Sequence, residues 1–281
     1  SLNNGNGAII NGQKNIHLVT YNPSNSLQNE FKSSEKITAV IAGDCSSYWV
    51  VTQFMDKFYS FRVSSSGVDP NPVISDISNN FAPILDDQEI NITSRGYLKI
   101  SPDGNKMAAA YSQTSLGSPR TGGGKNSGEV YLYDFDDETG RVTNEELLLL
   151  DTYPYGVEFS PKSTKLYVTT NEYEGGDILQ ESKIYQFNLE SSNIRNSGTV
   201  INSSSNVAGA LQLAINGKIY RAGYPKDGGS ESHNSLSVIS NPEMDPGNVN
   251  YRHNSVDISP NDAKLGLPPF VQSLFQNSFD V

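Results

Sequence analysis

The stretch Ser101-Pro102-Asp103-Gly104-Asn105-Lys106-Met107 decides the fold, because the chain repeats it. Close copies begin at Ser160 (Ser160-Pro161-Lys162-Ser163-Thr164-Lys165-Leu166) and Ser259 (Ser259-Pro260-Asn261-Asp262-Ala263-Lys264-Leu265), a shortened copy at Ala214, and a weaker copy at Ala42. These starts are separated by 59, 59, 54 and 45 residues. Repeats of roughly 20 to 50 residues, or slightly more, are typical of solenoids, propellers and arrays.

The second repeat shows how each unit is built. Pro102 fixes φ and Gly104 tolerates positive φ, so the phrase predicts a tight turn between two strands. Around it, apolar and aromatic runs predict four strands, at 96–100, 107–111, 130–135 and 147–150. Four antiparallel strands per repeat are typical of a propeller blade. We therefore predict an all-β fold, a β-propeller with about five four-stranded blades in this chain and six or seven in the intact protein.

The other repeats divide similarly, and the whole of 1–281 is expected to be a single propeller domain. Their strands are predicted at 37–41, 48–54, 58–63, 73–77, 156–159, 165–169, 184–189, 199–201, 211–213, 218–222 and 236–239. No segment has a sustained 3.6-residue apolar period, so helices should be scarce. The longest loops, 112–128, 171–181 and 224–234, follow the second strand of their repeats. Because a repeat fold gathers equivalent loops on one rim, these three should share one face.

Charge and composition exclude several classes of partner. The net charge of −11 repels phosphate backbones and anionic headgroups, so nucleic acid is not an expected partner. No apolar run approaches the roughly 20 residues of a membrane span, so no membrane insertion is expected. Cys45 is the only cysteine, which excludes an intrachain disulfide. Because it lies beside an apolar run, we expect a buried or half-buried thiol.

Several phrases together resemble a known family. They include Gly96-Tyr97-Leu98-Lys99-Ile100-Ser101-Pro102-Asp103-Gly104, Pro154-Tyr155-Gly156-Val157-Glu158-Phe159-Ser160-Pro161 and Leu265-Gly266-Leu267-Pro268-Pro269-Phe270-Val271-Gln272-Ser273. With these, the chain resembles the β-propeller region of surface proteins from gliding, type IX-secreting bacteria, which typically carry a C-terminal type B sorting domain. The resemblance implies a secreted or outer membrane-associated protein and supplies no catalytic motif. Family members usually begin with one or two further blades, which this chain is expected to lack.

The histidines and acidic clusters offer few sites. His17, His233 and His253 have no zinc-binding spacing. His17 is expected on the polar side of a strand, whereas His233, in the loop with Asp227, is the more plausible ligand contact. The acidic runs 134–138 and 86–89 are interpreted as turns because neither fits a calcium-binding EF-hand loop. We nominate no metal ligand and no cofactor, although calcium remains open.

Tyrosine supplies the binding hypothesis. Tyr153, Tyr155, Tyr173, Tyr224 and Tyr251 are predicted in loops or at strand ends, where rings can stack on sugars or anchor protein contacts. Tyr173 and Tyr224 are the preferred ligand-binding residues, together with Asp227 and His233, because they lie in the long equivalent loops. Trp49, within an apolar run, is expected in the core.

Three functions are compatible with the predicted fold and candidate residues. The preferred one is a binding or scaffolding propeller that contacts a surface polysaccharide or a protein partner through its loop rim. The first alternative is a lactonase- or glycosidase-like hydrolase with acidic residues in its central channel. The second is a rigid spacer of an adhesin. No acid recurs in register along the strands predicted nearest the axis, and neither a serine-nucleophile elbow nor a sialidase box is present. We therefore nominate no catalytic residue and expect the chain not to be an enzyme.

Overall fold

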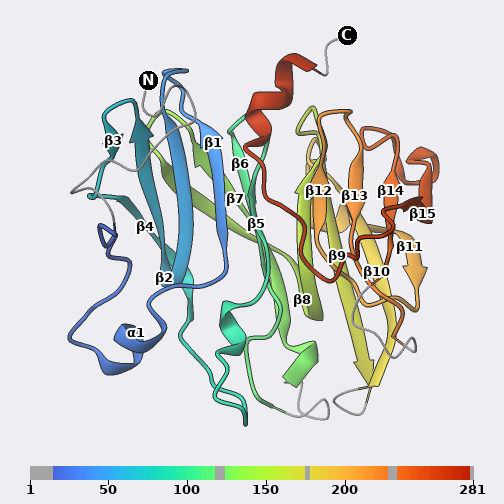
Figure 1. Cartoon of the computed structure of the whole chain (residues 1–281), viewed down its shortest axis with the longest axis horizontal. Helices are drawn as coiled ribbons and strands as arrows, with labels where there is room; N and C mark the ends of the chain where they lie inside the picture. Colours follow the sequence, from blue (N-terminus) through green and yellow to red (C-terminus); the bar gives the residue numbers. More distant parts are fainter. Residues whose placement is uncertain (1–14, 118–123, 175–177, 227–232, 279–281) are drawn as a thin grey trace.

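The structure is a computed structural model that describes residues 15–117, 124–174, 178–226 and 233–278 (Figure 1). Its one α-helix among these residues is α1 (Ser26–Phe31), and the remaining helical pieces are 3₁₀ segments. They are η2 (Ile92–Ser94), η4 (Gly124–Asn126), η5 (Arg195–Ser197), η6 (Pro246–Asn248) and η7 (Gln272–Ser278). Within the described chain, no helix is both long and apolar enough to cross a membrane. The predicted all-β class and scarcity of helices are confirmed.

The strands form four successive antiparallel units. The first contains β1 (Ile37–Ile41), β2 (Tyr48–Ser64), β3 (Gly67–Val68) and β4 (Val73–Phe81). The second contains β5 (Leu98–Ile100), β6 (Lys106–Tyr111), β7 (Gly128–Asp136) and the start of β8 (Arg141–Phe159). The third contains the end of β8 with β9 (Lys165–Glu174), β10 (Ile178–Asn188) and β11 (Thr199–Ser204). The fourth contains β12 (Leu211–Leu213), β13 (Ile219–Arg221), β14 (Ser235–Ile239) and β15 (Tyr251–Asp257).

Strand β2 folds back on itself. Arg62 lies over the Trp49 ring at 5.5 Å, and its Nε donates to the Ser47 hydroxyl at 3.0 Å. Residues 13 apart in one straight strand would be about 40 Å apart. The reversal falls at Met55, whose φ is +56°, so β2 supplies the two middle strands predicted at 48–54 and 58–63.

Strand β8 belongs to two units. Its residues Arg141 to Thr152 pair with β7, and its residues Tyr153 to Phe159 pair with β9. The sheet of seven strands therefore runs without a break from β5 to β11, although it contains two repeats.

The repeated phrase forms the same turn four times. In each copy the N–H of the fourth residue donates to the carbonyl of the first, and the fourth residue has positive φ. These bonds join Cys45 to Ala42 at 2.8 Å and Gly104 to Ser101, Ser163 to Ser160 and Gly217 to Ala214 at 2.9 Å. Cys45 is exposed because it occupies this left-handed position at the tip of its turn, with φ +55°. The prediction of a buried or half-buried thiol is therefore wrong.

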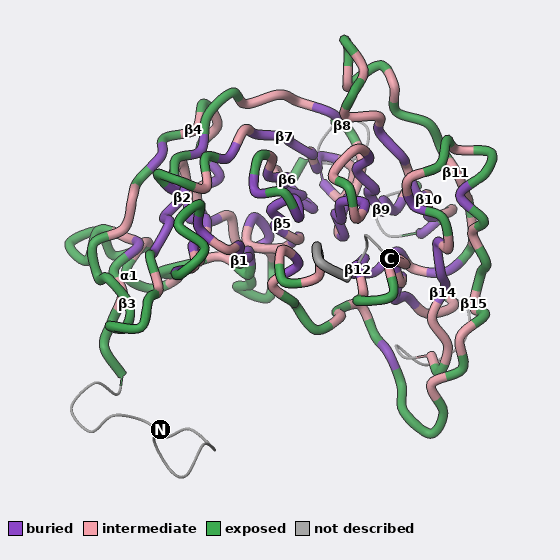
Figure 2. Tube along the Cα trace, turned by 90° about the horizontal axis from the view of Figure 1, so that it is seen from above, coloured by how far each residue is buried: buried purple, intermediate pink, exposed green. Residues whose placement is uncertain are grey.

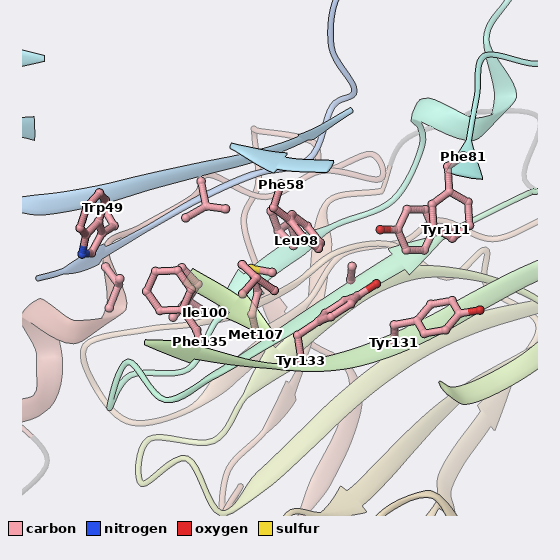
Figure 3. Packing of buried hydrophobic residues seen from close by; sticks show 14 of the residues in the cluster. Trp49, Phe58, Phe81, Leu98, Ile100, Met107, Tyr111, Tyr131, Tyr133 and Phe135 are labelled. Atoms are coloured by element: carbon pink, nitrogen blue, oxygen red, sulfur yellow. The ribbon is translucent and has the colours of Figure 1, made fainter. Parts of the chain in front are cut away.

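The hydrophobic core lies between neighbouring units. Figure 3 shows the layer between the first two, where Phe58 packs edge-on against Tyr133 with ring centroids 5.0 Å apart. Trp49 is 4% exposed, which confirms its predicted core position, and its indole N–H donates to the carbonyl of Asp137 at 2.7 Å. The small side chains of Ala108, Ala109 and Ala110 let the second unit approach both of its neighbours.

The four units stand side by side along a curved path, with β1, β5 and β12 toward its inner side (Figure 2). This is propeller-like architecture, but a count of five blades is not confirmed. The fifth copy of the phrase, from Ser259, forms no strand; its pairing among the described residues is an isolated bridge between Ala263 and His233.

Candidate functional site: the inner strands and the tyrosine row

The inner strands of three units contribute one buried polar cluster. Lys99 Nζ lies 3.2 Å from Glu158 Oε2 and donates to Gln212 Oε1 at 2.6 Å. Glu158 also accepts the backbone N–H groups of Phe159 and Leu213, each at 2.9 Å. Glu158 is fully buried, and Lys99 and Gln212 are each 4% exposed. The cluster therefore ties the second, third and fourth units together through a satisfied buried ion pair.

This cluster was missed by the sequence reasoning, although a signal for it exists. Lys99, Glu158 and Gln212 stand two positions before Ser101, Ser160 and Ala214, so they are equivalent residues of three repeats. These three equivalent positions carry a base, an acid and an amide, so no single residue type recurs among them.

The C-terminal segment, Leu265–Ser273, crosses the inner side of the units. The Leu265 carbonyl accepts from Ala210 N–H at 2.7 Å, and the Ser273 hydroxyl accepts from Ile41 N–H at 2.9 Å. Between them, Leu267 is held by the Tyr97 hydroxyl. The segment thus touches the inner strands of the first and second units and the start of the fourth.

Two hollows lie against this segment and share Ile37, Tyr97 and Pro269. The first, of about 210 Å³, is mostly apolar and is lined by Ile37, Thr38, Ala39, Val50, Tyr97, Lys99, Pro269, Phe270 and Val271. The second, of about 220 Å³, is lined by Glu35, Ile37, Tyr97, Leu98, Tyr155, Leu267 and Pro269. Tyr97 and Pro269 therefore stand between two small hollows on the inner side of the arc.

Four half-buried tyrosines lead from the second hollow to the loop rim. Tyr97 and Tyr155 form one edge-on pair, and Tyr153 and Tyr173 form another, each with ring centroids 5.3 Å apart. Tyr153 and Tyr155 are two residues apart on β8, and the Tyr97 N–H donates to the Tyr155 carbonyl at 2.9 Å, so the two pairs are close neighbours. Burial raises the pKa of Tyr155, and the charge of Glu35 acts in the same direction. We call Tyr97, Tyr155, Tyr153 and Tyr173 the tyrosine row.

Two cations flank the outer pair of the row. Lys125 Nζ lies 4.7 Å from the centroid of the Tyr173 ring, within cation–π range. Partial burial opposes the charged form of Arg95, but interactions with Tyr153 and with the carboxylates of Asp86 and Glu35 outweigh it and raise the pKa of Arg95. Lys125 therefore lies over one ring of the outer pair, and Arg95 lies near the other.

Lys36 supports the segment that carries Arg95. The Lys36 amine is completely buried, lies 4.6 Å from the Tyr111 ring centroid, and donates to the carbonyls of Ser94 and Arg95 at 3.1 Å. Burial lowers the pKa of Lys36 to about 7. This amine fixes the backbone from which Arg95 and the start of β5 extend.

The long loops meet as the sequence predicted, within the described residues. The Asn126 side-chain amide clamps the Tyr173 backbone, donating to its carbonyl at 2.7 Å and accepting its N–H at 3.2 Å. From the third loop, Lys226 donates to the carbonyl of Leu179, the residue that pairs with Tyr173 across β9 and β10. The three loops therefore lie on one rim, and Tyr173 is central to it.

The structure does not bring the other residues nominated from the sequence into one cluster. Tyr224 is half-buried, and its carbonyl accepts from Val207 N–H at 2.8 Å. His233 exchanges both backbone hydrogen bonds with Ala263, each at 2.9 Å. Its segment therefore pairs with the segment around Ala263. Asp227 lies outside the described residues. Tyr251 lies elsewhere, with its hydroxyl accepting from Arg221 at 3.0 Å.

The acidic runs form turns, as interpreted. Asp136 accepts from Glu138 N–H at 3.0 Å and from the Thr139 hydroxyl at 2.7 Å, and Asp86 accepts from Gln88 and Ile90 N–H groups. Across the described ranges, no group of three or more His, Cys, Asp or Glu side chains is placed to hold a metal ion.

No protein-family model matches the chain, and no curated protein matches it. Solved structures do resemble it. A protein of Bacteroides uniformis assigned as a 6-phosphogluconolactonase is 15% identical, with a TM-score of 0.39, over 72% of this chain and 49% of its own. TolB from Acinetobacter baumannii is 14% identical, with a TM-score of 0.41, over 75% and 41%. A glucose dehydrogenase is 12% identical, with a TM-score of 0.44, over 72% and 59%.

These comparisons correct one expectation. The chain spans about half the length of these structures, and identities this low concern the fold alone. Two of the three are nevertheless described as enzymes, so the expectation that this chain is not an enzyme is contradicted and is withdrawn. None of their activities is transferred to this chain.

Proposed function

We propose that this chain is a carbohydrate-binding module of a secreted or cell-surface protein, and that it holds an extended polysaccharide along the tyrosine row. The observation that carries the proposal is the pairing of Tyr153 with Tyr173 on the rim where the three long loops meet. Tyrosine rings offer a flat apolar face and a polar tip at small entropic cost. A pyranose ring, apolar on one face and polar at its edge, matches that surface.

The geometry of the row supports a polymer rather than a single sugar. Its two pairs have the same 5.3 Å ring spacing, and the row continues from the rim to the hollow beside Tyr97. The Asn126 clamp fixes the Tyr173 backbone in advance, so little conformational freedom is lost on binding.

The location is part of the proposal. The phrases that resemble type IX-secreted surface propellers support a place on the outer surface of the cell, where a polysaccharide is accessible. Protease treatment of intact source cells tests this location. Rapid degradation of the protein supports a place on the cell surface, and complete protection of the protein on cells that remain intact contradicts it.

The binding itself is tested by calorimetric titration of the purified chain with soluble polysaccharides. We expect Tyr173→Ala to weaken binding roughly three- to tenfold, because a lost aromatic contact is worth about 0.5–1.5 kcal/mol. Tyr48→Ala is the matched control, since Tyr48 is a half-buried tyrosine beside the turn of the first unit. Equal binding by both variants would contradict the site, and no binding to any polysaccharide would favour the rigid spacer.

A further inference from the structure

A buried arginine lies between the third and fourth units. Arg221, on β13, is 2% exposed, and its guanidinium donates to three hydroxyls. Its Nη2 donates to Ser182 at 2.7 Å, and its Nη1 donates to Tyr251 at 3.0 Å and to Ser204 at 3.4 Å. Ser182 and Ser204 pair across β10 and β11 of the third unit, whereas Tyr251 belongs to β15 of the fourth. The guanidinium is therefore held from both units.

The charge of Arg221 differs from the other buried charges of the protein. The buried cations of the described chain are Lys36, Lys99, Lys165 and Arg221. Lys99 and Lys165 each have a carboxylate partner, and Lys36 can release its proton because burial lowers its pKa to about 7. Arg221 takes part in no ion pair within the described ranges, and an arginine does not lose its proton in proteins. Since charged groups are almost never fully buried unless they are paired, the Arg221 charge calls for a negative partner.

Arg221 also has hydrogen-bond donors left for such a partner. A guanidinium has five N–H groups, and the three hydroxyls take three of them. The Nε–H is one of the remaining two, and it is buried without a hydrogen-bond partner. The hydroxyls that accept from Arg221 keep their own O–H groups as donors. These surroundings are rich in donors and suit a group that only accepts.

His253 links this guanidinium to the surface. Its Nδ1 lies 3.1 Å from the Tyr251 hydroxyl, and His253 itself is exposed on β15. The Tyr251 hydroxyl therefore lies between an exposed imidazole and the buried guanidinium. Partial burial lowers the pKa of His253, and the positive charges of Arg221 and His233 act in the same direction. A negative charge beside Arg221 would relieve this repulsion.

We propose that a small inorganic oxyanion, of the sulfate or phosphate kind, binds to the Arg221 guanidinium between the third and fourth units. Two of its oxygens would accept from the Nε–H and from a terminal N–H, an arrangement that the planar fork of arginine matches. The near-complete burial of Arg221 limits the ligand to a small ion. The net charge of −11 repels anions in general, so the attraction is local to this guanidinium. The site is separate from the tyrosine row and does not depend on polysaccharide binding.

The test is calorimetric titration of the full chain with sodium sulfate, sodium phosphate and sodium chloride at constant ionic strength. We expect one saturable site for an oxyanion. Arg221→Met should weaken this binding at least tenfold, because hydrogen bonds between charged groups are among the strong ones. Arg252→Gln is the matched control, since Arg252 is an exposed arginine next to Tyr251 on β15, and successive side chains of a strand point to opposite faces. It should bind as tightly as the wild type.

A second measurement follows the His253 ring in the wild type by NMR. The oxyanion should shift the imidazole resonances with the same midpoint as the calorimetric titration and should raise the pKa of His253. Arg221, Tyr251 and His233 are the charged or titratable groups that act on this ring, and only an added negative charge moves its pKa upward. A thermal melt checks that Arg221→Met folds, and the NMR titration decides if it does not.

Three results would overturn the proposal. The first is the absence of saturable binding of both oxyanions, together with an unmoved His253 signal. The second is binding that a folded Arg221→Met variant retains, or that Arg252→Gln loses to the same extent, since either would place the attraction elsewhere. The third is chloride binding as tight as that of sulfate and phosphate, which would contradict recognition of an oxyanion by the guanidinium fork.

Discussion

The Tyr97 hydroxyl forms hydrogen bonds with both backbone polar groups of Leu267. The Tyr97 hydroxyl donates to the Leu267 carbonyl at 3.1 Å and accepts the Leu267 N–H at 3.0 Å, although the two residues are 170 positions apart. One side chain of the second unit therefore fixes the C-terminal segment against the inner strands. The contact recognises a peptide group, so it depends on the position of Leu267 rather than on its side chain.

Tyr97→Phe should loosen this segment while the units remain folded. Two hydrogen bonds are lost, at about 1 kcal/mol each, without a change in ring packing. Hydrogen exchange followed by mass spectrometry should show faster exchange in peptides covering 265–273. Unchanged exchange there would mean that Ala210 and Ile41 hold the segment without Tyr97.

Glu158→Gln should be strongly destabilising. It leaves the Lys99 ammonium buried without its counter-charge, and breaking a buried pair costs about 3–5 kcal/mol. Urea denaturation measures the loss in the free energy of unfolding. The double variant Lys99→Met with Glu158→Gln removes both charges and should recover much of it; an additive double variant would show that the two charges do not interact.

Lys36 should make stability rise with pH in the alkaline range. Its pKa is about 7 in the folded chain and 10.5 when exposed, so the unfolded chain binds the extra proton between these values. The unfavourable burial of charge is complete below pH 7 and is relieved as the pH rises toward 10.5. Relative to Lys36→Met, the wild type should gain up to about 1.4 kcal/mol per pH unit in this window. A difference that stays constant from pH 7 to 10 would contradict a lowered pKa.

Cys45→Gly should stabilise the first turn. Cys45 has φ +55°, a region that costs an L-residue roughly 1–2 kcal/mol and costs glycine nothing. Thermal unfolding should show a modest increase in Tm for Cys45→Gly and little change for the control Cys45→Ala, which keeps the unfavourable φ. In the folded wild type the exposed thiol should also react fully with a maleimide.

The repeated phrase was enough to predict the all-β fold class and most strands. It encodes a turn with a positive-φ position, and such a turn is recognisable from residues adjacent in sequence. β1 has the predicted bounds, Ile37–Ile41, and the three long loops meet on one rim. β15 was not predicted, since Tyr251–Asp257 alternates few apolar residues and is mostly exposed.

The site was less predictable, because it depends on contacts between units. Tyr173 was nominated from its loop, but its pairing with Tyr153 requires the third unit to be folded. Tyr97 looked like an ordinary strand residue, and nothing local connects it to Leu267. The Lys99–Glu158–Gln212 cluster becomes visible only when equivalent positions of the repeats are compared across different side-chain chemistries.

Strand β8 has a further consequence. Strand β8 is the last strand of the second unit and the first strand of the third. Unfolding of either unit therefore disturbs the backbone hydrogen bonds of the other. The middle of the chain is therefore a single cooperative block, in which a disturbance at the outer edge of one repeat reaches the inner edge of the next through the main chain itself. Tyr153 and Glu158 both lie on that strand, so the tyrosine row and the buried ion pair share one strand.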